Sequence, residues 1–456
     1  MNPLTLVEVE KAIGRRPRGG EVVEFSGVST DSRTIRPGDL FVAIKGENFD
    51  GHDFVEAAFK KGARGAVVSR PIKLTSDYGD KAVFVVDDTI RALGDIAGRY
   101  RSRLDTRIIG ITGSNGKTTT KEMTIHLLGK HARVTGAKKS FNNFIGVPLT
   151  LFSVEPGDDY AVIEMGTSAP GEIARLAEIA QPEIGVITNV SATHLEGLGS
   201  EEGVANAKAE LLDAIDKDGA AVLNRDNRWT DYIRPRCKGR VITFGESEGA
   251  DVRAERVIQN GEGLKFNIER QGFVVPVVGR HNVLNALAAA AVCRYFGFSL
   301  ADISEAFRDF ELPPMRLQRL VIGRVTFVND AYNANPVSMA ASVATFAEIT
   351  ADRKVFVCGD MLELGENSAK LHREVGRKIA EAGADVLWAV GEKAENAADA
   401  AVEAGMAAGA VYRAKTSEEA GERIADTLRP GDLVFLKGSR GMALEKILDR
   451  VKTRLT

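Results

Sequence analysis

The chain has 456 residues, more than one ordinary domain of about 100–200 residues contains, so several domains are expected. Hydrophobic residues make up 44% of the chain and aromatic residues only 6%, and the formal net charge is −3. Such a small charge gives no electrostatic basis for nucleic acid or a membrane surface as the main partner. The three cysteines (Cys237, Cys293 and Cys358) are far apart and form no CxxC pair, which argues against a disulfide framework or a zinc site.

The first 14 residues carry acidic side chains where a signal peptide would be basic and then apolar. The longest apolar run, residues 286–293, is far shorter than the ~20 residues that a membrane-spanning helix needs. A cytoplasmic protein without a membrane span is therefore expected, and a monomer is the expected oligomeric state.

Residues 1–86 contain short strand-like pieces at 22–25, 39–44 and 65–68 and one helical pattern near 52–61. A second helical pattern, 89–100, leads into a glycine-rich loop. The first segment is predicted to be a small α/β domain.

From residue 108 to about 312, apolar strand patterns alternate with helical ones; the strands are expected at 108–111, 161–164, 185–188, 220–223 and 241–244. Short buried strands separated by helices indicate a parallel sheet covered on both faces. Pro313 and Pro314 mark a boundary, because consecutive prolines do not continue a helix. Beyond them, strands at 354–358, 385–390 and 433–436 predict another α/β unit. The expected fold is α/β with three domains, 1–86, 87–312 and 313–456, of which the second and third have parallel sheets.

The loop GSNGKTT follows a strand and precedes a helix, which is the context of a phosphate-binding loop. Its backbone N–H groups and the helix N-terminus favour an anion. Lys117 is expected to reach the β- and γ-phosphates of ATP, and a threonine hydroxyl, that of Thr118, to ligate Mg²⁺. Ile111 stands where the usual spacing has the first glycine, and the loop alone does not separate ATP from GTP. A simple helix-capping turn is the alternative. The predicted nucleotide-binding residues of the loop are Gly113, Ser114, Asn115, Gly116, Lys117, Thr118 and Thr119.

Glu164 and His194 each follow a predicted strand of the same domain. Ligands gather at the carboxyl ends of the strands in open α/β sheets, so both side chains are expected near the loop, where they could hold Mg²⁺. Taken alone, His194 is better explained as an ordinary loop histidine, but together with Glu164 and the loop it is favoured as a metal ligand.

Lys208 falls on the apolar face of a helix at 203–215, between Val204 and Leu211. Such a lysine either extends its ammonium to water or is placed for function. A desolvated amine loses its proton readily and can then react.

Three further groups of polar residues are candidates: Asn282, Arg316, and the amide-rich stretch 329–336. The last is also explained by a polar turn before a helix. Its candidate residues are Asp330, Tyr332, Asn333 and Asn335.

Over essentially its whole length the sequence resembles the Mur ligase family, ATP-dependent amide-bond formers of peptidoglycan precursor synthesis. The resemblance implies a UDP-binding domain, a central ATPase domain and a Rossmann-like C-terminal domain. It implies an ATP loop at 112–118, magnesium ligation by Glu164 and His194, and a Lys208 carbamylated by CO₂. It further implies adenine or ribose contacts from Asn282 and Asp330 and a phosphate contact from Arg316. The residues expected to act in catalysis are Lys117, Lys208, His194 and Arg316.

Several motifs resemble the dipeptide-adding branch of the family. The N-terminal motif resembles the UDP-sugar domain that the diamino-acid-adding and dipeptide-adding ligases share, with Ser29, Thr30, Asp31, Ser32 and Arg33 as candidate substrate contacts. The stretch 141–148, with Asn142 and Asn143, and the DAYNANP stretch 330–336 resemble this branch specifically, as do 359–365 and 437–440. Phe144 departs from it, because close relatives often carry histidine there. The implied substrates are UDP-N-acetylmuramoyl-tripeptide, whose third residue the sequence does not identify, and D-alanyl-D-alanine.

The resemblance implies that the tripeptide carboxylate attacks the γ-phosphate of ATP and that the dipeptide amine attacks the resulting acyl phosphate. Two other ligases are alternatives, a diamino-acid-adding Mur ligase and a folylpolyglutamate synthase. A nucleotide-switched binding protein without ligation chemistry is a third.

Overall fold

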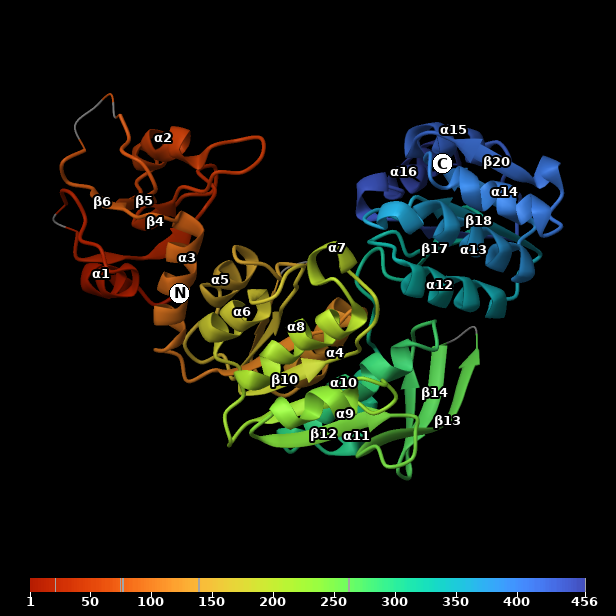
Figure 1. Cartoon of the computed structure of the whole chain (residues 1–456), viewed down its shortest axis with the longest axis horizontal. Helices are drawn as coiled ribbons and strands as arrows, with labels where there is room; N and C mark the ends of the chain where they lie inside the picture. The colour runs from red at the N-terminus through yellow and green to blue at the C-terminus, as the bar shows by residue number, and fades with distance from the viewer. Residues whose placement is uncertain (21, 74, 76–77, 138–139, 261–262, 456) are drawn as a thin grey trace. The chain divides into compact units, whose positions relative to one another are not determined.

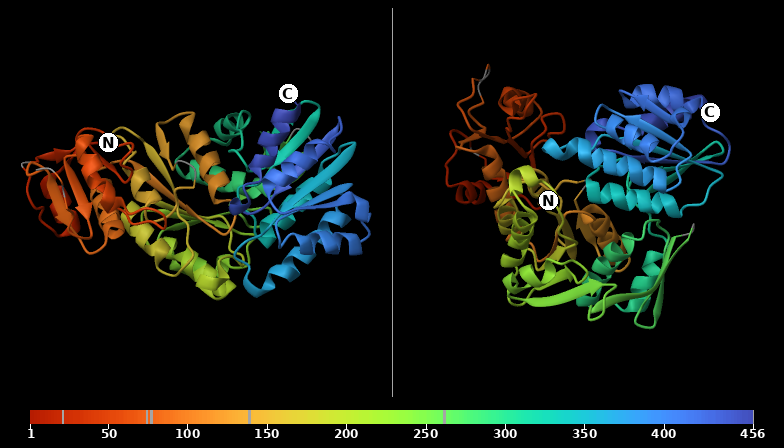
Figure 2. Two further views of the ribbon diagram at one scale, coloured as in Figure 1. Left: turned by 90° about the horizontal axis from the view of Figure 1, so that it is seen from above. Right: turned by 45° about the vertical axis from the view of Figure 1, so that its right-hand side comes forward.

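The protein is described from a computed structural model that covers residues 1–20, 22–73, 75, 78–137, 140–260 and 263–455. The chain divides into two compact units (Figure 1 and Figure 2). The first comprises Met1–Val190, Glu202–Thr243 and Ala291–Cys293, and the second comprises Ser191–Glu201, Phe244–Ala290 and Arg294–Thr456. Each is described by itself.

The first unit begins with a four-stranded parallel sheet in the order β3-β4-β5-β6, and a short antiparallel pair, β1 with β2. Thr5 starts the first helix with a capping box, since its hydroxyl accepts from the Glu8 backbone and the Glu8 carboxylate accepts from its N–H. The strands are β1 (Leu4–Thr5), β2 (Glu24–Phe25), β3 (Gly27–Ser29), β4 (Asp39–Val42), β5 (Gly65–Val68) and β6 (Ala82–Val85). The helices are α1 (Leu6–Ile13), η1 (Gly51–Phe54), α2 (Val55–Lys60) and α3 (Thr89–Arg101).

The second sheet of this unit is parallel and has the order β11-β10-β7-β9-β8, with β12 next to β11. Its strands are buried and rich in isoleucine and valine, as expected of a sheet covered on both faces. The strands are β7 (Arg107–Thr112), β8 (Val134–Gly136), β9 (Tyr160–Glu164), β10 (Ile184–Ile187), β11 (Ala220–Asn224) and β12 (Arg240–Gly245). The helices are α4 (Lys117–Gly129), α5 (Gly146–Leu151), α6 (Glu172–Ala180), α8 (Glu201–Asp213), α9 (Thr230–Ile233) and η2 (Arg234–Arg236).

The second unit contains an antiparallel meander and several helices that precede the C-terminal sheet. The meander consists of β13 (Val252–Asn260), β14 (Gly263–Ile268) and β15 (Gln271–Val275). The helices of this part are α7 (Leu195–Leu198), α10 (Asn282–Tyr295) and α11 (Leu300–Phe307).

The C-terminal sheet has six strands in the order β16-β17-β21-β18-β19-β20, parallel except for the β16–β17 pair. Neighbouring residues of β18 alternate between two apolar cores, with Phe356 in one and Val355 and Val357 in the other. Figure 1 shows α15 and α16 on one side of these strands and α12 on the other. The strands are β16 (Gln318–Ile322), β17 (Val325–Asn329), β18 (Arg353–Gly359), β19 (Val386–Val390), β20 (Val411–Ala414) and β21 (Asp432–Lys437). The helices are α12 (Pro336–Glu348), η3 (Gly365–Asn367), α13 (Ser368–Glu381), α14 (Glu395–Glu403), η4 (Ala408–Ala410), α15 (Ser417–Ala425), η5 (Arg440–Met442) and α16 (Glu445–Leu455).

The predicted α/β fold with parallel sheets is confirmed, and each strand predicted after residue 107 corresponds to an observed strand. The expected strand at 22–25 is shorter, since β2 begins at Glu24, and the meander β13–β15 was not predicted. The domain limits 1–86, 87–312 and 313–456 stay predictions. Pro313 and Pro314 do lie between α11 and β16, outside any helix. Within the described residues, no helix is both long and apolar enough to cross a membrane.

A close helix contact in the C-terminal region gives a test of the packing. A Cβ atom added to Gly376 in α13 would lie 2.0 Å from the backbone oxygen of Ala397 in α14. Because a backbone atom is not displaced cheaply, we expect Gly376→Ala to lower the free energy of unfolding by about 1–3 kcal/mol, despite the better helix propensity of alanine. Urea unfolding followed by circular dichroism measures this.

The matched control is Gly409→Ala in η4, where an added Cβ has no atom within 4 Å. It should change the stability by less than about 0.5 kcal/mol. Equal unfolding midpoints for the two variants would contradict the packing of α13 on α14.

Candidate functional site

The predicted phosphate loop lies between β7 and α4. Gly116 is the N-cap of α4 with φ 82°, and no side chain caps this helix end. A Cβ on Gly113, whose φ is 149°, would lie 1.9 Å from the Thr188 hydroxyl. Glycine is therefore required here by both backbone conformation and space. The helix N-terminus that results is suited to bind an anion.

The loop backbone is held by the end of the neighbouring strand β10. The N–H groups of Ser114 and Asn115 donate to the backbone and side-chain oxygens of Asn189, at 2.9 and 3.0 Å. The Asn115 carbonyl accepts from the Thr188 hydroxyl and from the Asn189 amide, at 2.5 and 3.0 Å. Asn224, at the end of β11, donates in turn to the Thr188 carbonyl at 2.9 Å. These hydrogen bonds fix the loop backbone, which lowers the entropy cost of binding a ligand there.

Lys117 folds back over this loop. Its ammonium donates to the Gly113 carbonyl at 2.7 Å. The positive charge therefore lies at the loop, although its predicted phosphate contacts stay predictions. Thr119 is buried in the first turn of α4, and its predicted role also stays a prediction.

Glu164 ends β9, the strand on the other side of β7, and is only 1% exposed. One carboxylate oxygen accepts from the Thr118 hydroxyl at 2.8 Å, and the other accepts from the Asn142 side-chain amide at 2.8 Å. The Asn142 carbonyl accepts from the Gly166 N–H at 2.8 Å. The structure thus brings together three of the predicted site residues, Thr118, Glu164 and Asn142.

Within the described ranges, no three or more His, Cys, Asp or Glu side chains are grouped as metal ligands. Mg²⁺ does not require such a group, since it binds through one or two carboxylates, water and substrate phosphates. A hydroxyl hydrogen-bonded to a buried carboxylate beside a phosphate loop fits this ion. His194 belongs to the second unit, where it is the N-cap of α7 with φ 53°. Its predicted place in the metal site stays a prediction.

Lys208 lies in α8 and is 2% exposed. Its ammonium therefore does not extend to water, which removes one of the two interpretations of the sequence pattern. Burial and, secondly, the positive charge of Lys117 hold the pKa of Lys208 well below its ordinary value. A low pKa favours the neutral, nucleophilic amine.

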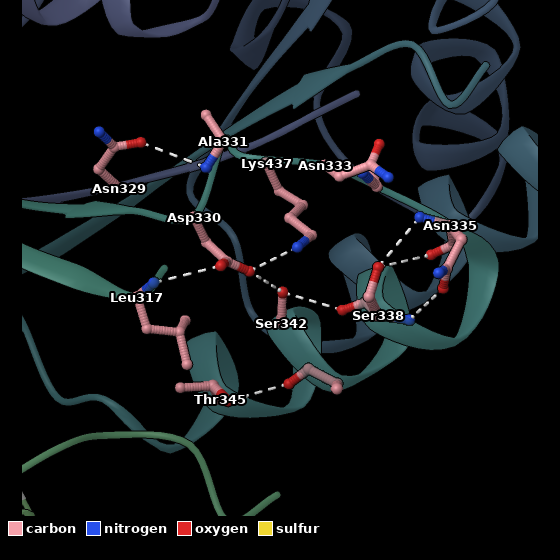
Figure 3. Close-up of polar contacts among 12 residues, drawn as sticks. Leu317, Asn329, Asp330, Ala331, Asn333, Asn335, Ser338, Ser342, Thr345 and Lys437 are labelled. Atoms are coloured by element: carbon pink, nitrogen blue, oxygen red, sulfur yellow. Dashed lines mark hydrogen bonds and ion pairs between the residues drawn. The ribbon is translucent and has the colours of Figure 1, made fainter. Parts of the chain in front are cut away.

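A second group of polar residues is built around the predicted site residue Asp330, which follows β17 in the second unit (Figure 3). One Asp330 oxygen accepts from the Lys437 ammonium at 2.7 Å and the Ser342 hydroxyl at 2.6 Å. The other accepts from the Leu317 N–H at 3.2 Å. Asp330 therefore joins β17, β21, α12 and the loop before β16.

Arg316, in that same loop, places its guanidinium 4.2 Å from the centre of the Tyr332 ring. This cation–π contact brings two predicted site residues together at the carboxyl end of β17. The contact orients the guanidinium, which is the group expected to meet phosphate.

The asparagines of the DAYNANP stretch partly fit the alternative of a polar turn. Asn335 caps α12 in a reciprocal pair with Ser338, at 2.8 and 3.0 Å (Figure 3). The Asn333 side chain accepts from the Ala334 N–H at 2.9 Å. Asn282 is buried and donates to the Val278 carbonyl at 2.8 Å while accepting from Asn285. The ligand contacts expected of these asparagines and of Asp330 stay predictions.

The remaining candidates also take part in local structure. Asn143 accepts from the N–H groups of Ile145 and Gly146 at the start of α5. Asp31 binds the Arg33 guanidinium with both oxygens, and these bonds lower the pKa of its carboxyl to about 2. The Ser29 hydroxyl donates to the Asp31 carbonyl. The Ser32 carbonyl accepts from the Lys61 ammonium. Substrate contacts of these residues and of Thr30 stay predictions.

Sequence reasoning missed several residues that build the two groups: Thr188, Asn189, Asn224, Ser342 and Lys437. Thr188, Asn189, Asn224 and Lys437 could have been found, since each is at or directly after the end of a predicted strand. Ser342 lies within a helix and carries no such signal.

Three family descriptions match this chain: "Mur ligase family, catalytic domain" over residues 24–101, "Mur ligase middle domain" over 111–293, and "Mur ligase, glutamate ligase domain" over 315–440. The UDP-N-acetylmuramoyl-tripeptide–D-alanyl-D-alanine ligase of Bacillus subtilis is 36% identical over 447 residues, covering 97% of this chain and 96% of the relative.

Solved structures agree over the whole length. The crystal structure of MurF from Acinetobacter baumannii has a TM-score of 0.89 at 32% identity and covers 99% of both chains. MurF ligase from Thermotoga maritima in complex with ADP has a TM-score of 0.82 at 28% identity, with 94% of this chain and 97% of that one covered. The chain belongs to the Mur ligase family.

Proposed function

We propose that this chain is an ATP-dependent ligase that joins D-alanyl-D-alanine to UDP-N-acetylmuramoyl-tripeptide in peptidoglycan precursor synthesis, releasing ADP and phosphate. The observation that carries the proposal is the phosphate loop beside the buried Thr118–Glu164 pair. It is supported by the Bacillus subtilis relative, which matches nearly the whole chain and is named for this activity. We also propose that the enzyme is a monomer and that it acts in the cytoplasm, as expected from the sequence.

The chemistry requires two anions, the tripeptide carboxylate and the γ-phosphate, to approach each other. Lys117 would supply positive charge at the loop, where its ammonium already lies 2.7 Å from the Gly113 carbonyl. Thr118 and Glu164 would hold Mg²⁺, which when bound neutralises charge on the phosphates. Arg316 is proposed to add a second cation. The products of this step are an acyl phosphate and ADP.

The dipeptide amine then attacks the activated carbonyl and phosphate leaves. Asp330 and Asn282 are proposed to contact the nucleotide, and His194 to take part in metal binding. The N-terminal motif around Asp31 and Arg33 is proposed to hold the UDP-sugar. We further propose that the neutral Lys208 amine forms an N–C bond to CO₂ and releases one proton to solvent, giving a carbamate whose negative charge would orient the metal ion.

The reaction is tested by phosphate release from ATP with UDP-N-acetylmuramoyl-tripeptide, with and without D-alanyl-D-alanine. Release that requires both substrates, with a UDP-pentapeptide product in the mass spectrum, is expected. Phosphate release that requires instead a diamino acid and a UDP-dipeptide would indicate that the chain is a diamino-acid-adding Mur ligase. ATP binding without release in either mixture would indicate a binding protein.

The metal site is tested with Glu164→Gln, which keeps the shape of the side chain and removes its charge. We expect the Mg²⁺ concentration for half-maximal activity to rise by about 10- to 100-fold, because a neutral amide is a weak ligand of a hard cation. The matched control is Glu178→Gln in α6, an exposed glutamate of the same unit. An unchanged Mg²⁺ dependence of Glu164→Gln would remove Glu164 from the metal site.

The carbamate is tested with Lys208→Ala. This variant should lose activity by about 10- to 100-fold or more and regain part of it with an added short-chain carboxylate, which replaces the missing anion. ¹³C-labelled bicarbonate should give a carbamate NMR signal in the parent chain and none in the variant. Full activity of Lys208→Ala without any carboxylate would end this part of the proposal.

A further inference from the structure

Lys121 is a charged residue in the interior that the proposed chemistry does not use. It lies in α4, and its side chain is 0% exposed. A buried ammonium costs several kcal/mol unless it is paired and hydrogen-bonded, so its contacts matter. Its Nζ donates to the Ala137 carbonyl at 2.7 Å and lies 2.9 Å from a Glu122 carboxylate oxygen.

The carbonyl that Lys121 binds belongs to Ala137, three residues before Ser140 and five before Asn142; the described residues of this segment are 137 and 140–142. Farther along this segment, the Ser140 hydroxyl lies 3.4 Å from that of Thr118. The Asn142 amide donates to Glu164 at 2.8 Å. The segment is therefore anchored at Ala137 by Lys121, and at Asn142 by the Gly166 N–H.

Helix α4 carries both Lys121 and Thr118, the residue that binds Glu164. Thr118 and Lys121 are three residues apart in α4 and so project from the same face. One helix face thus carries both the hydroxyl that meets Glu164 and the cation that fixes the segment from which Asn142 meets Glu164. Loss of the Lys121 contact would therefore affect the Asn142 side of that carboxylate, because Thr118 is held in place by the helix itself.

We propose that Lys121 is a positioning residue: its ammonium holds the Ala137 carbonyl and thereby places Ser140 and Asn142 against Thr118 and Glu164. The expected effect of Lys121 on turnover rests on the proposed function, whereas its expected effect on Mg²⁺–ATP binding does not. Without the Lys121 contact, Asn142 keeps only the hydrogen bond from the Gly166 N–H to its carbonyl, and its side-chain amide holds the Glu164 carboxylate less firmly. A role in stability alone would leave the Mg²⁺ dependence unchanged.

The test compares Lys121→Met, which removes the donor and keeps much of the volume, with Lys121→Gln, which keeps a donor. Lys121→Met should weaken Mg²⁺–ATP binding, measured by calorimetry, by about 10-fold, with Lys121→Gln between it and the parent chain. The KM for D-alanyl-D-alanine should not change. The matched control is Lys130→Met at the exposed end of the same helix, which should bind Mg²⁺–ATP like the parent chain.

A double-mutant cycle then separates positioning from stability. If Lys121 acts through Asn142, adding Asn142→Ala to Lys121→Met should weaken binding little further. Additive effects, or normal Mg²⁺–ATP binding by a folded Lys121→Met, would overturn the proposal. Should Lys121→Met not fold, the same cycle with Lys121→Gln decides. A parent chain that binds Mg²⁺–ATP but releases no phosphate would refute the proposed function while leaving this binding test intact.

Discussion

The nucleotide site depends on the contact between the phosphate loop and the end of β10. Gly113 passes so close to Thr188 that no side chain fits, and Asn189 binds the two residues that follow Gly113. Because β7 and β10 are parallel neighbours, the loop and these polar residues emerge at the same edge of the sheet. The hydrogen bonds that pin the loop are therefore a consequence of strand order.

The same strand order explains the position of the carboxylate. β9 lies on the opposite side of β7 from β10, so Glu164 reaches the first turn of α4 from the other flank of the loop. A carboxylate that is 1% exposed needs donors, and Thr118 and Asn142 supply them. A cation bound there would take the place of the Thr118 hydroxyl proton as the partner of the Glu164 carboxylate.

Much of this could be predicted from the sequence, because the informative residues end apolar strands. The strand–loop–helix at 107–129 and Glu164 at the end of β9 follow from local pattern and from the geometry of parallel sheets. The meander β13–β15 was missed because its strands are only half buried and its pairing is antiparallel. Asn335 shows another limit: an amide that caps a helix and one that contacts a ligand look alike in a sequence.

Lys117 and Lys208 differ in how well their surroundings stabilise a positive charge, and this difference bears on their chemistry. Lys117 is part-buried and keeps a carbonyl acceptor, which suits an ammonium. Lys208 is buried, and the charge of Lys117 disfavours a second cation beside it, so its pKa is lowered. Since a site for two approaching anions needs positive charge, a lysine whose charged form is disfavoured is poorly suited to supply it. A carbamate on this amine would instead be stabilised, because its negative charge would be attracted by the positive charge of Lys117.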